Sequence, residues 1–298
     1  PTCGSAGMLI SAIAHLKEHG EEWRNVRTYG QEINQLSSAI GRMNLFLHGV
    51  KDFEIANDDT LRYPAFLEAG KLRTFDMVLA NPPYSIKQWD REAFASDPYG
   101  RNFLGTPPQG RADYAFIQHI LKSMDPRTGR CSILLPHGVL FRNEESEMRE
   151  RLVRSDLVEA VIGLGANLFF NSPMEACILI CRSEKAPNRS KKILFVDASA
   201  EVTRKNAQSY LEPQHIKRIV DAYRSDEDIE GFSSHASFSE LEDNAFSLSI
   251  PLYVKPSNDE NADDRSIEET VESWRAASTE AASLLDNIAA KLHENDGE

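Results

Sequence analysis

Short apolar runs alternate with amphipathic stretches along most of this chain. Strand-length apolar runs indicate buried strands, whereas apolar residues at steps of three and four indicate helices. Strands that alternate with helices are typical of an α/β fold with a doubly wound, mostly parallel sheet, in which ligands bind beyond the carboxyl ends of the strands. The pattern predicts helices near residues 7–19, 34–47, 113–124, 144–154 and 214–223, and strands near residues 26–29, 75–80, 131–135, 160–164, 177–181 and 191–197.

The most informative motif directly follows the expected strand at residues 75–80, and it consists of Asn81, Pro82, Pro83 and Tyr84. Two consecutive prolines fix φ and remove two backbone donors, which leaves a rigid turn whose carbonyl oxygens can accept hydrogen bonds from a ligand. The Asn81 side-chain oxygen and the Pro82 carbonyl can each accept one N–H of a planar exocyclic amine. The Tyr84 ring offers a stacking face, worth about 1–3 kcal/mol for a nucleic-acid base.

Such a turn suits methyl transfer to an amino nitrogen. Transfer from a sulfonium leaves transient positive charge on the nitrogen, which fixed acceptors stabilise. The same acceptors hold the amine in line with the methyl group, so orientation also lowers the barrier. The simpler alternative is that the tetrapeptide only ends a strand. The motif alone does not distinguish these two interpretations.

A glycine-containing loop stands at the start of the sequence. Apolar residues at helical spacing follow it from Met8 to Leu16, so the loop opens a helix. Glycines let a backbone approach a cofactor closely, and a helix N-terminus presents free N–H groups, as in dinucleotide-binding turns. The candidate cofactor-binding residues in this loop are Thr2, Cys3, Gly4, Ser5 and Gly7.

Two acidic residues follow later strand ends. Glu32 comes after the expected strand at residues 26–29, at the usual distance for a carboxylate that binds ribose hydroxyls. Asp59 and Thr60 lie in a polar turn after a third candidate strand, where an acid can accept a hydrogen bond from a cofactor's adenine amine. Each acid has a simpler alternative, with Glu32 at the N-terminus of a helix and Asp59 in a solvated turn.

These four pieces occur in one order, namely glycine loop, ribose acid, second acid and the motif at residues 81–84. In this order the sequence resembles the methylation subunit of type I DNA restriction-modification systems. Further matching segments are residues 112–121, 129–130, 134–142, 160–164, 167–169 and 178–179. The resemblance implies the fold of S-adenosylmethionine-dependent methyltransferases, S-adenosyl-L-methionine as cofactor, and the N6 amine of adenine in double-stranded DNA as methyl acceptor.

On this resemblance, residues 3–7 would hold the methionine part of the cofactor and Glu32 its ribose hydroxyls. Asp59, with the adjacent Thr60, would contact its adenine. Residues 81–84 would take the target base, which must flip out of the duplex at a cost of a few kcal/mol for unstacking.

The sequence departs from the family pattern at its start. In the family an Asp and the first strand of the sheet precede the loop, with a helical domain ahead of that strand, whereas this sequence begins at Pro1. We therefore expect an N-terminally truncated subunit. Ala6 occupies a position where the family usually has glycine.

Charge bears on the expected partners. The formal net charge is −13, which repels a phosphate backbone. From Pro256 onward twelve acids face three bases, a net of −9, so the remainder carries only −4. The catalytic part shows no dense basic stripe. This fits the family, in which a specificity subunit reads the DNA beside two methylation subunits, and a restriction subunit is a further partner.

The remaining composition indicates a cytoplasmic protein. We find no membrane-spanning run and no signal peptide. The cysteines, Cys3, Cys131, Cys177 and Cys181, form no Cys-x-x-Cys pair, so we expect neither a disulfide nor a metal site.

Three segments divide the sequence. Residues 1–255 form the expected catalytic domain, residues 256–265 an acidic linker, and residues 266–298 a C-terminal helix. Mostly apolar positions along this helix, with Ser278 among them, alternate steps of four and three from Ile267 to Leu292, a heptad seam. The resemblance favours docking of this helix on a specificity subunit, and the alternative is that it packs on its own domain.

A long polar stretch at residues 89–111 follows Tyr84 closely. Loops of this length are usually functional or disordered, and we expect this one to close over the target base or to touch DNA. Two other functions are compatible with the sequence. The same tetrapeptide occurs in enzymes that methylate a protein glutamine amide, and the chain could also be a non-catalytic assembly module that lacks cofactor binding.

Overall fold

The computed structural model describes residues 1–169, 173–206, 208–255, 271, 274–275 and 278. The chain divides into two compact units, Pro1–Pro256 and Ser257–Glu298. The expected acidic linker and most of the expected C-terminal helix lie outside the described residues. Their assignments therefore stay predictions, and the fold below is that of the first unit.

Six strands form the main sheet in the order β12-β9-β7-β8-β6-β5. Strand β5 is parallel to β6 and β7 is parallel to β9, whereas β8 is antiparallel to both β6 and β7, and β12 is antiparallel to β9. Hence β5, β6, β7 and β9 all run in one direction, and the expected mostly parallel sheet is confirmed. The bounds are β5 (Met77–Ala80), β6 (Arg130–Pro136), β7 (Val158–Leu164), β8 (Ala176–Arg182), β9 (Lys192–Ala198) and β12 (Ser233–Ser237).

A separate parallel pair is formed by β1 (Thr28–Gln31) and β2 (Phe53–Ala56). The predicted strand at residues 26–29 was two residues early, because the Val26 N–H donates to the Trp23 carbonyl in a turn and the ladder begins only where Thr28 N–H meets Asp52 O. Two short hairpins complete the strands, β3 (Leu67–Glu68) with β4 (Lys71–Leu72) and β10 (Thr203–Lys205) with β11 (Gln208–Tyr210).

The five helices expected between residues 7 and 223 are all present, at or close to their predicted bounds. They are α1 (Gly7–Glu18), α2 (Gln35–Leu47), α4 (Asp113–Lys122), α5 (Ser146–Arg154) and α6 (Pro213–Arg224). Two short helices were not predicted, α3 (Arg91–Ala95) and α7 (Phe238–Asp243). Both helices are too short to show a helical pattern of apolar residues. Each begins at a side-chain cap, Asp90 or Ser237. The 3₁₀ turns are η1 (His137–Leu140), η2 (Asn143–Glu145), η3 (Pro187–Arg189) and η4 (Ile250–Leu252).

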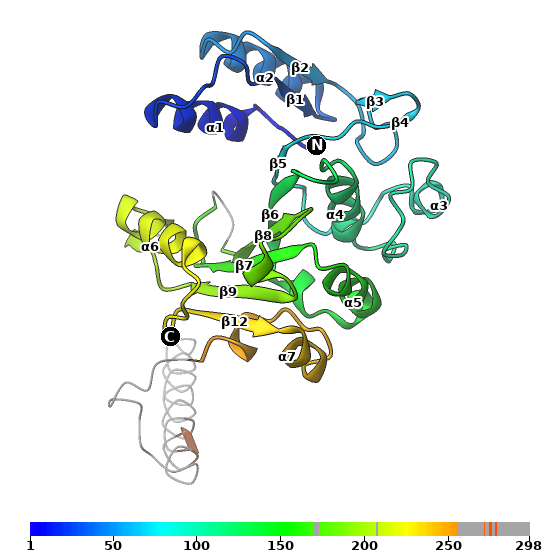
Figure 1. Ribbon diagram of the computed structural model, residues 1–298. Coiled ribbons are helices and arrows are strands. Elements are labelled where there is room, and N and C mark those ends of the chain that lie inside the picture. Colours follow the sequence, from blue (N-terminus) through cyan, green and yellow to red (C-terminus); the bar gives the residue numbers. More distant parts are fainter. Residues whose placement is uncertain (170–172, 207, 256–270, 272–273, 276–277, 279–298) are drawn as a thin grey trace, which may run out of the picture. The chain divides into compact units, whose positions relative to one another are not determined.

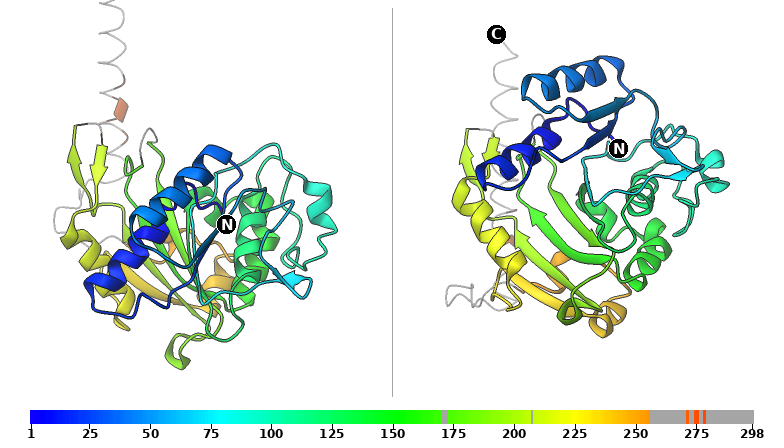
Figure 2. Two further views of the ribbon diagram at one scale, coloured as in Figure 1. Left: turned by 90° about the horizontal axis from the view of Figure 1, so that it is seen from above. Right: turned by 45° about the horizontal axis from the view of Figure 1, so that its top comes forward.

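Helices cover both faces of the main sheet, with α6 on one face and α4, α5 and α7 on the other (Figures 1 and 2). Strand β7 is apolar apart from Glu159, and all seven of its residues are buried. Its Val161 packs in the cluster with α4 and α5, whereas the flanking Ala160 and Ile162 pack in the cluster with α6. A strand buried on both faces needs no polar alternation. Strand β2 packs with α1 and α2 in a cluster of its own.

Gly30 in β1 lies directly under the start of the chain. A Cβ at this position would approach Cys3 Sγ and Ile55 Cδ1 to 2.7 Å each, closer than real Cβ contacts. A side chain at residue 30 would therefore displace the side chains of Cys3 and Ile55.

We predict that Gly30→Ala lowers the free energy of unfolding by about 1–3 kcal/mol through overpacking. Urea denaturation of the purified chain measures this change. Gly110→Ala is the control, because a Cβ there meets no atom within 4 Å, and its effect should stay within about 0.5 kcal/mol. Equal effects of the two substitutions would contradict the packing argument.

Candidate active site

The first residues of the chain join the carboxyl ends of β1 and β5. Thr2 N–H and Cys3 N–H donate to the Gln31 carbonyl oxygen at 2.9 and 3.0 Å. On the other side, the Thr2 hydroxyl donates to the Asn81 carbonyl oxygen at 3.3 Å. The glycine loop thus stands beside the strand end that carries the Asn-Pro-Pro-Tyr motif, as Figure 1 shows from the position of the N-terminus near β5.

The loop itself is a tight turn into α1. Ala6 N–H donates to the Cys3 carbonyl at 2.8 Å, and both Gly4 and Ala6 have positive φ, +54° and +64°. The left-handed conformation costs a side-chain-bearing residue about 1–2 kcal/mol. This explains why glycine suits position 6. Ala6 is nevertheless accommodated, with its methyl group 1% exposed in the cluster of α1 and α2.

Glu32 is brought against the glycine loop. Its Oε2 accepts the Gly4 N–H at 3.0 Å and its Oε1 accepts the Asn34 N–H at 2.9 Å. The Asn57 side chain donates to the carbonyls of Glu32 and Ile33 at 2.7 and 3.0 Å. The carboxylate therefore has a fixed orientation, and each oxygen keeps a lone pair that can accept a ribose hydroxyl.

The second acid lies in the turn that follows β2. Asp59 Oδ1 accepts the N–H groups of Leu61 and Arg62 at 2.8 and 3.3 Å, which caps the turn. Thr60 is 4% exposed. One Asp59 oxygen therefore stabilises the turn itself, as the solvated-turn alternative expects. The role of Asp59 and Thr60 in cofactor binding stays a prediction.

The motif at residues 81–84 presents different exposures along its length. Asn81 and Pro83 are exposed, Pro82 is buried and Tyr84 is half-buried. The Asn81 side-chain amide has no hydrogen-bond partner among the described residues, so its oxygen is free to accept. Burial raises the pKa of Tyr84 to about 12, with Cys177 and Asp113 as smaller causes. The ring is therefore a neutral stacking surface at physiological pH.

A buried arginine anchors the long loop at residues 89–111 through hydrogen bonds. Arg101, 2% exposed, donates to Asp97 Oδ1 from Nε and Nη2 at 2.9 and 2.6 Å. Its guanidinium also donates to the carbonyls of Thr60 and Leu61, at 2.9 and 2.7 Å. The loop is thereby fastened to the turn that contains the second acid. Whether it also closes over a base or touches DNA stays a prediction.

Several residues that organise the site were not predicted from the sequence. Gln31 holds the segment after β2, because its side chain donates to Tyr63 O and accepts from Ala65 N–H. Arg101 and Asp113 are buried charges, and nothing in their local sequence marks them as buried. Asp113 lies in a segment that carries the family resemblance, which was the one available signal.

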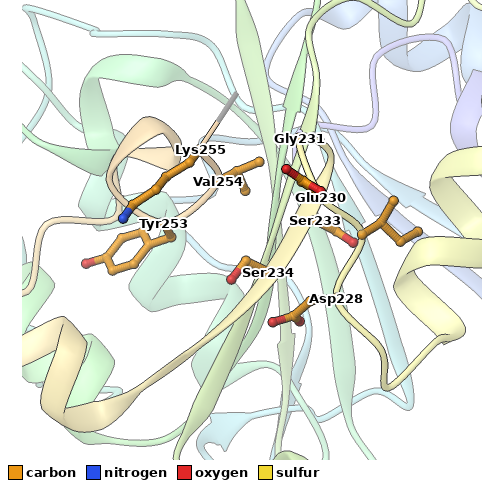
Figure 3. A pocket seen from close by; sticks show the side chains of 9 residues that line it. Asp228, Glu230, Gly231, Ser233, Ser234, Tyr253, Val254 and Lys255 are labelled. Carbon is orange, nitrogen blue, oxygen red and sulfur yellow. The ribbon is translucent and has the colours of Figure 1, made fainter. Parts of the chain in front are cut away.

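A cavity of about 1100 Å³ separates β1 from β5. Its lining includes both strands, Pro1, and the aromatic side chains of Tyr29, Phe66 and Phe75. None of the predicted catalytic residues, nor Glu32 or Asp59, lines it. A second cavity, of about 340 Å³, lies between the turn before the edge strand β12 and residues 253–255 (Figure 3). It contains none of the predicted site residues either.

The residues present fit a nucleoside-containing cofactor. The fixed Glu32 carboxylate, the glycine loop and the N-terminus of α1 stand together, and a Cβ added at Gly4 or Gly7 would meet nothing within 4 Å, so the backbone is open to close approach. Cys3, Cys131, Cys177 and Cys181 are free thiols. Within the described part of the chain, no group of three or more His, Cys, Asp or Glu side chains could hold a metal ion. None of the described helices is long and apolar enough to cross a membrane.

The fold, with its glycine loop, acids and Asn-Pro-Pro-Tyr turn at the strand ends, is that of S-adenosylmethionine-dependent methyltransferases. Residues 1–262 match the N-6 DNA Methylase family. The chain therefore belongs to this family, and the resemblance found in the sequence is confirmed.

The curated relatives of the chain include methylase subunits of type I restriction enzymes. The chain is 32% identical over 301 residues to the type I restriction enzyme MjaVII methylase subunit of Methanocaldococcus jannaschii, covering 97% of this chain and 50% of that protein. It is 30% identical to the HindI methylase subunit of Haemophilus influenzae, covering 88% of this chain and 59% of that protein. The chain thus spans about half the length of these relatives.

Among solved structures, the type I restriction-modification methyltransferase subunit from Streptococcus thermophilus superposes with a TM-score of 0.78 at 36% identity, over 86% of this chain and 53% of that one. The EcoKI M protein superposes with a TM-score of 0.65 at 16% identity, over 98% of this chain and 68% of that one. At that identity the second likeness shows the fold alone.

We predict that Arg101→Met lowers the free energy of unfolding by about 3–5 kcal/mol, because it leaves the Asp97 carboxylate buried without its partner. Urea denaturation checks this. The control is Arg27→Met, which removes the exposed Arg27–Asp52 pair, with side chains 65% and 56% exposed, and should cost less than about 1 kcal/mol. A similar small loss in both variants would show that the buried pair does not stabilise the loop.

Proposed function

We propose that the chain is the catalytic part of a modification subunit that transfers a methyl group from S-adenosyl-L-methionine to the N6 amine of adenine in DNA. One observation carries this proposal. Thr2 and Gly4 connect the glycine loop with both Asn81 and Glu32, so the predicted cofactor side and the predicted base side meet at one edge of the fold.

Different residues of the chain bind the cofactor and the target base. Glu32 accepts from the ribose hydroxyls, and the loop at residues 3–7 approaches the cofactor's methionine part. When bound, the cofactor supplies an electrophilic methyl group. The Asn81 side-chain oxygen and the Pro82 carbonyl accept the two N–H groups of the adenine amine and stabilise positive charge on its nitrogen. Tyr84 stacks on the flipped base and holds it in line.

The proposed substrate is double-stranded DNA, and the relatives named above are subunits of type I restriction enzymes. The net charge of −13 gives the chain little attraction for phosphates by itself. We infer that a specificity subunit supplies sequence recognition and DNA affinity, beside a second methylation subunit and, in the restricting complex, a restriction subunit. A cytoplasmic location follows from this role.

We predict that Asn81→Ala lowers methyl transfer by at least about 100-fold and changes the affinity for S-adenosylmethionine less than twofold. Glu32→Ala should instead weaken cofactor binding roughly tenfold or more, since it removes a charge-assisted acceptor. Calorimetric titration measures cofactor binding. Transfer of labelled methyl to duplex DNA, in complex with a specificity subunit, measures activity.

Asn188→Ala, at an exposed asparagine in η3, is the matched control and should leave both quantities unchanged. Unchanged methyl transfer in Asn81→Ala would rule out the proposed acceptor. Methylation of a protein glutamine in place of DNA would favour the alternative enzyme.

One observation favours the second candidate, a non-catalytic assembly module. Among the described residues, β1 pairs only with β2 and β5 pairs only with β6, so two strand edges face the cavity unpaired. Thr2 and Cys3 already bond to Gln31 at the end of β1, and Pro1 lines the cavity. We propose that an added extended segment can fill this space as a strand, and that cofactor binding requires such a strand.

We predict that adding an apolar segment of about five residues, rich in Val and Ile, ahead of Pro1 raises the melting temperature and strengthens binding of S-adenosylmethionine. An equally long segment with alternating prolines is the control, because proline cannot donate to a ladder. Equal behaviour of the two extensions would contradict strand insertion. If neither form nor the original chain binds the cofactor while all are folded, the assembly module becomes the better description.

A further inference from the structure

A cluster of buried charges lies behind the turn at residues 81–84. Asp113 at the start of α4 is 1% exposed, Glu145 in η2 is 0% exposed, and the Arg142 side chain between them is 14% exposed. Arg142 Nη2 donates to Asp113 Oδ2 at 2.7 Å, and Nε donates to Glu145 Oε2 at 2.7 Å. Segments nearly thirty residues apart thus share one ion-pair network.

The network reaches the residue that follows Tyr84. Ser85 N–H donates to Asp113 Oδ1 at 2.9 Å, and the Ser85 hydroxyl donates to Asp113 Oδ2 at 3.4 Å. Ser85 has a φ of +51°, a left-handed conformation that a residue with a side chain rarely adopts. Asp113 therefore supplies the hydrogen bonds that hold this conformation, and with it the exit of the chain from the Tyr84 turn.

Arg142 fixes the orientation of the Asp113 carboxylate. Arg142 also donates from Nη2 to Glu145 Oε1 at 3.2 Å, so its guanidinium is held by Glu145 and presents a fixed donor to Asp113. The Arg142 carbonyl accepts from Arg149 Nη1 at 2.9 Å, which anchors its backbone to α5. Such a chain of paired charges is rigid because breaking any member leaves a buried charge unpaired.

We propose that Asp113 and Arg142 are positioning residues that fix the backbone at Tyr84 and Ser85 and thereby set the orientation of the Tyr84 ring toward the target base. Only the last step of this proposal, orientation of the ring toward a target base, rests on the function proposed above. Its structural step, control of the Tyr84 ring by Asp113, concerns this chain alone.

The test compares Asp113→Leu and Asp113→Asn in the full chain. The asparagine oxygen can still accept the Ser85 N–H, whereas leucine offers no acceptor. The control is Glu159→Leu, which removes another buried carboxylate, 5% exposed, paired with Arg182 and bonded to the Tyr223 hydroxyl of α6 on the other face of the sheet. Urea denaturation confirms that each variant is folded under assay conditions.

The first readout is ¹⁹F NMR of fluorotyrosine-labelled protein, in which Tyr84→Phe identifies the Tyr84 resonance. We expect Asp113→Leu to shift or broaden this resonance, Asp113→Asn to restore it largely, and Glu159→Leu to leave it unchanged. An unchanged resonance in Asp113→Leu overturns the proposal, because the Tyr84 ring would then not depend on Asp113.

The second readout is methyl transfer in complex with a specificity subunit. Misplacement of a reacting group by about 1 Å can cost about 100-fold in rate. We therefore expect kcat to fall by about this factor in Asp113→Leu, with cofactor affinity within twofold and partial rescue in Asp113→Asn. An equal fall of kcat in Glu159→Leu overturns the positioning role. If the Tyr84 resonance responds but the unaltered chain transfers no methyl group, the proposed function fails and control of the turn by Asp113 stands.

Discussion

The carboxyl ends of β1 and β5 are held together by the first residues of the chain, and the candidate site depends on this connection. Thr2 bonds to the carbonyls of both Gln31 and Asn81, although no strand ladder links the two strands within the described residues. The Glu32 carboxylate then secures the glycine loop through Gly4. Without these few bonds, the acid that follows β1 and the turn that follows β5 would belong to separate pieces of sheet.

Two arginines, the buried Arg101 and the half-buried Arg142, organise the surroundings of the site. Arg101 fastens the loop at residues 89–111 to Thr60 and Leu61, and Arg142 fastens Asp113 against the turn after Tyr84. Arginine suits this task because its planar guanidinium presents five donors in fixed directions. Each arginine is paired with a buried carboxylate, Asp97 or Asp113, so burial of the charge is compensated. Both arginines thus hold segments of the chain that follow the Asn-Pro-Pro-Tyr turn.

Much of the fold follows from local sequence. Strands β6, β7 and β8 were predicted correctly because apolar runs of that length bury well only as strands between two helical layers. Strand β1 was predicted two residues early, since Val26 is apolar but bonds in a turn. The short α3 and α7 were missed, because five or six residues carry too little periodicity.

The sequence by itself determined the chemical inventory of the site, namely the glycine loop, Glu32, Asp59 and the Asn81 to Tyr84 turn, because these residue types occur at strand ends in a fixed order. Their catalytic and binding roles stay predictions. Only the tertiary structure decided that Gly4 meets Glu32, that Thr2 meets Asn81, and that Asp113 supports Ser85. The physical reason is that pairing of distant charges and backbone groups depends on how the chain folds back on itself, and no local pattern records those distances.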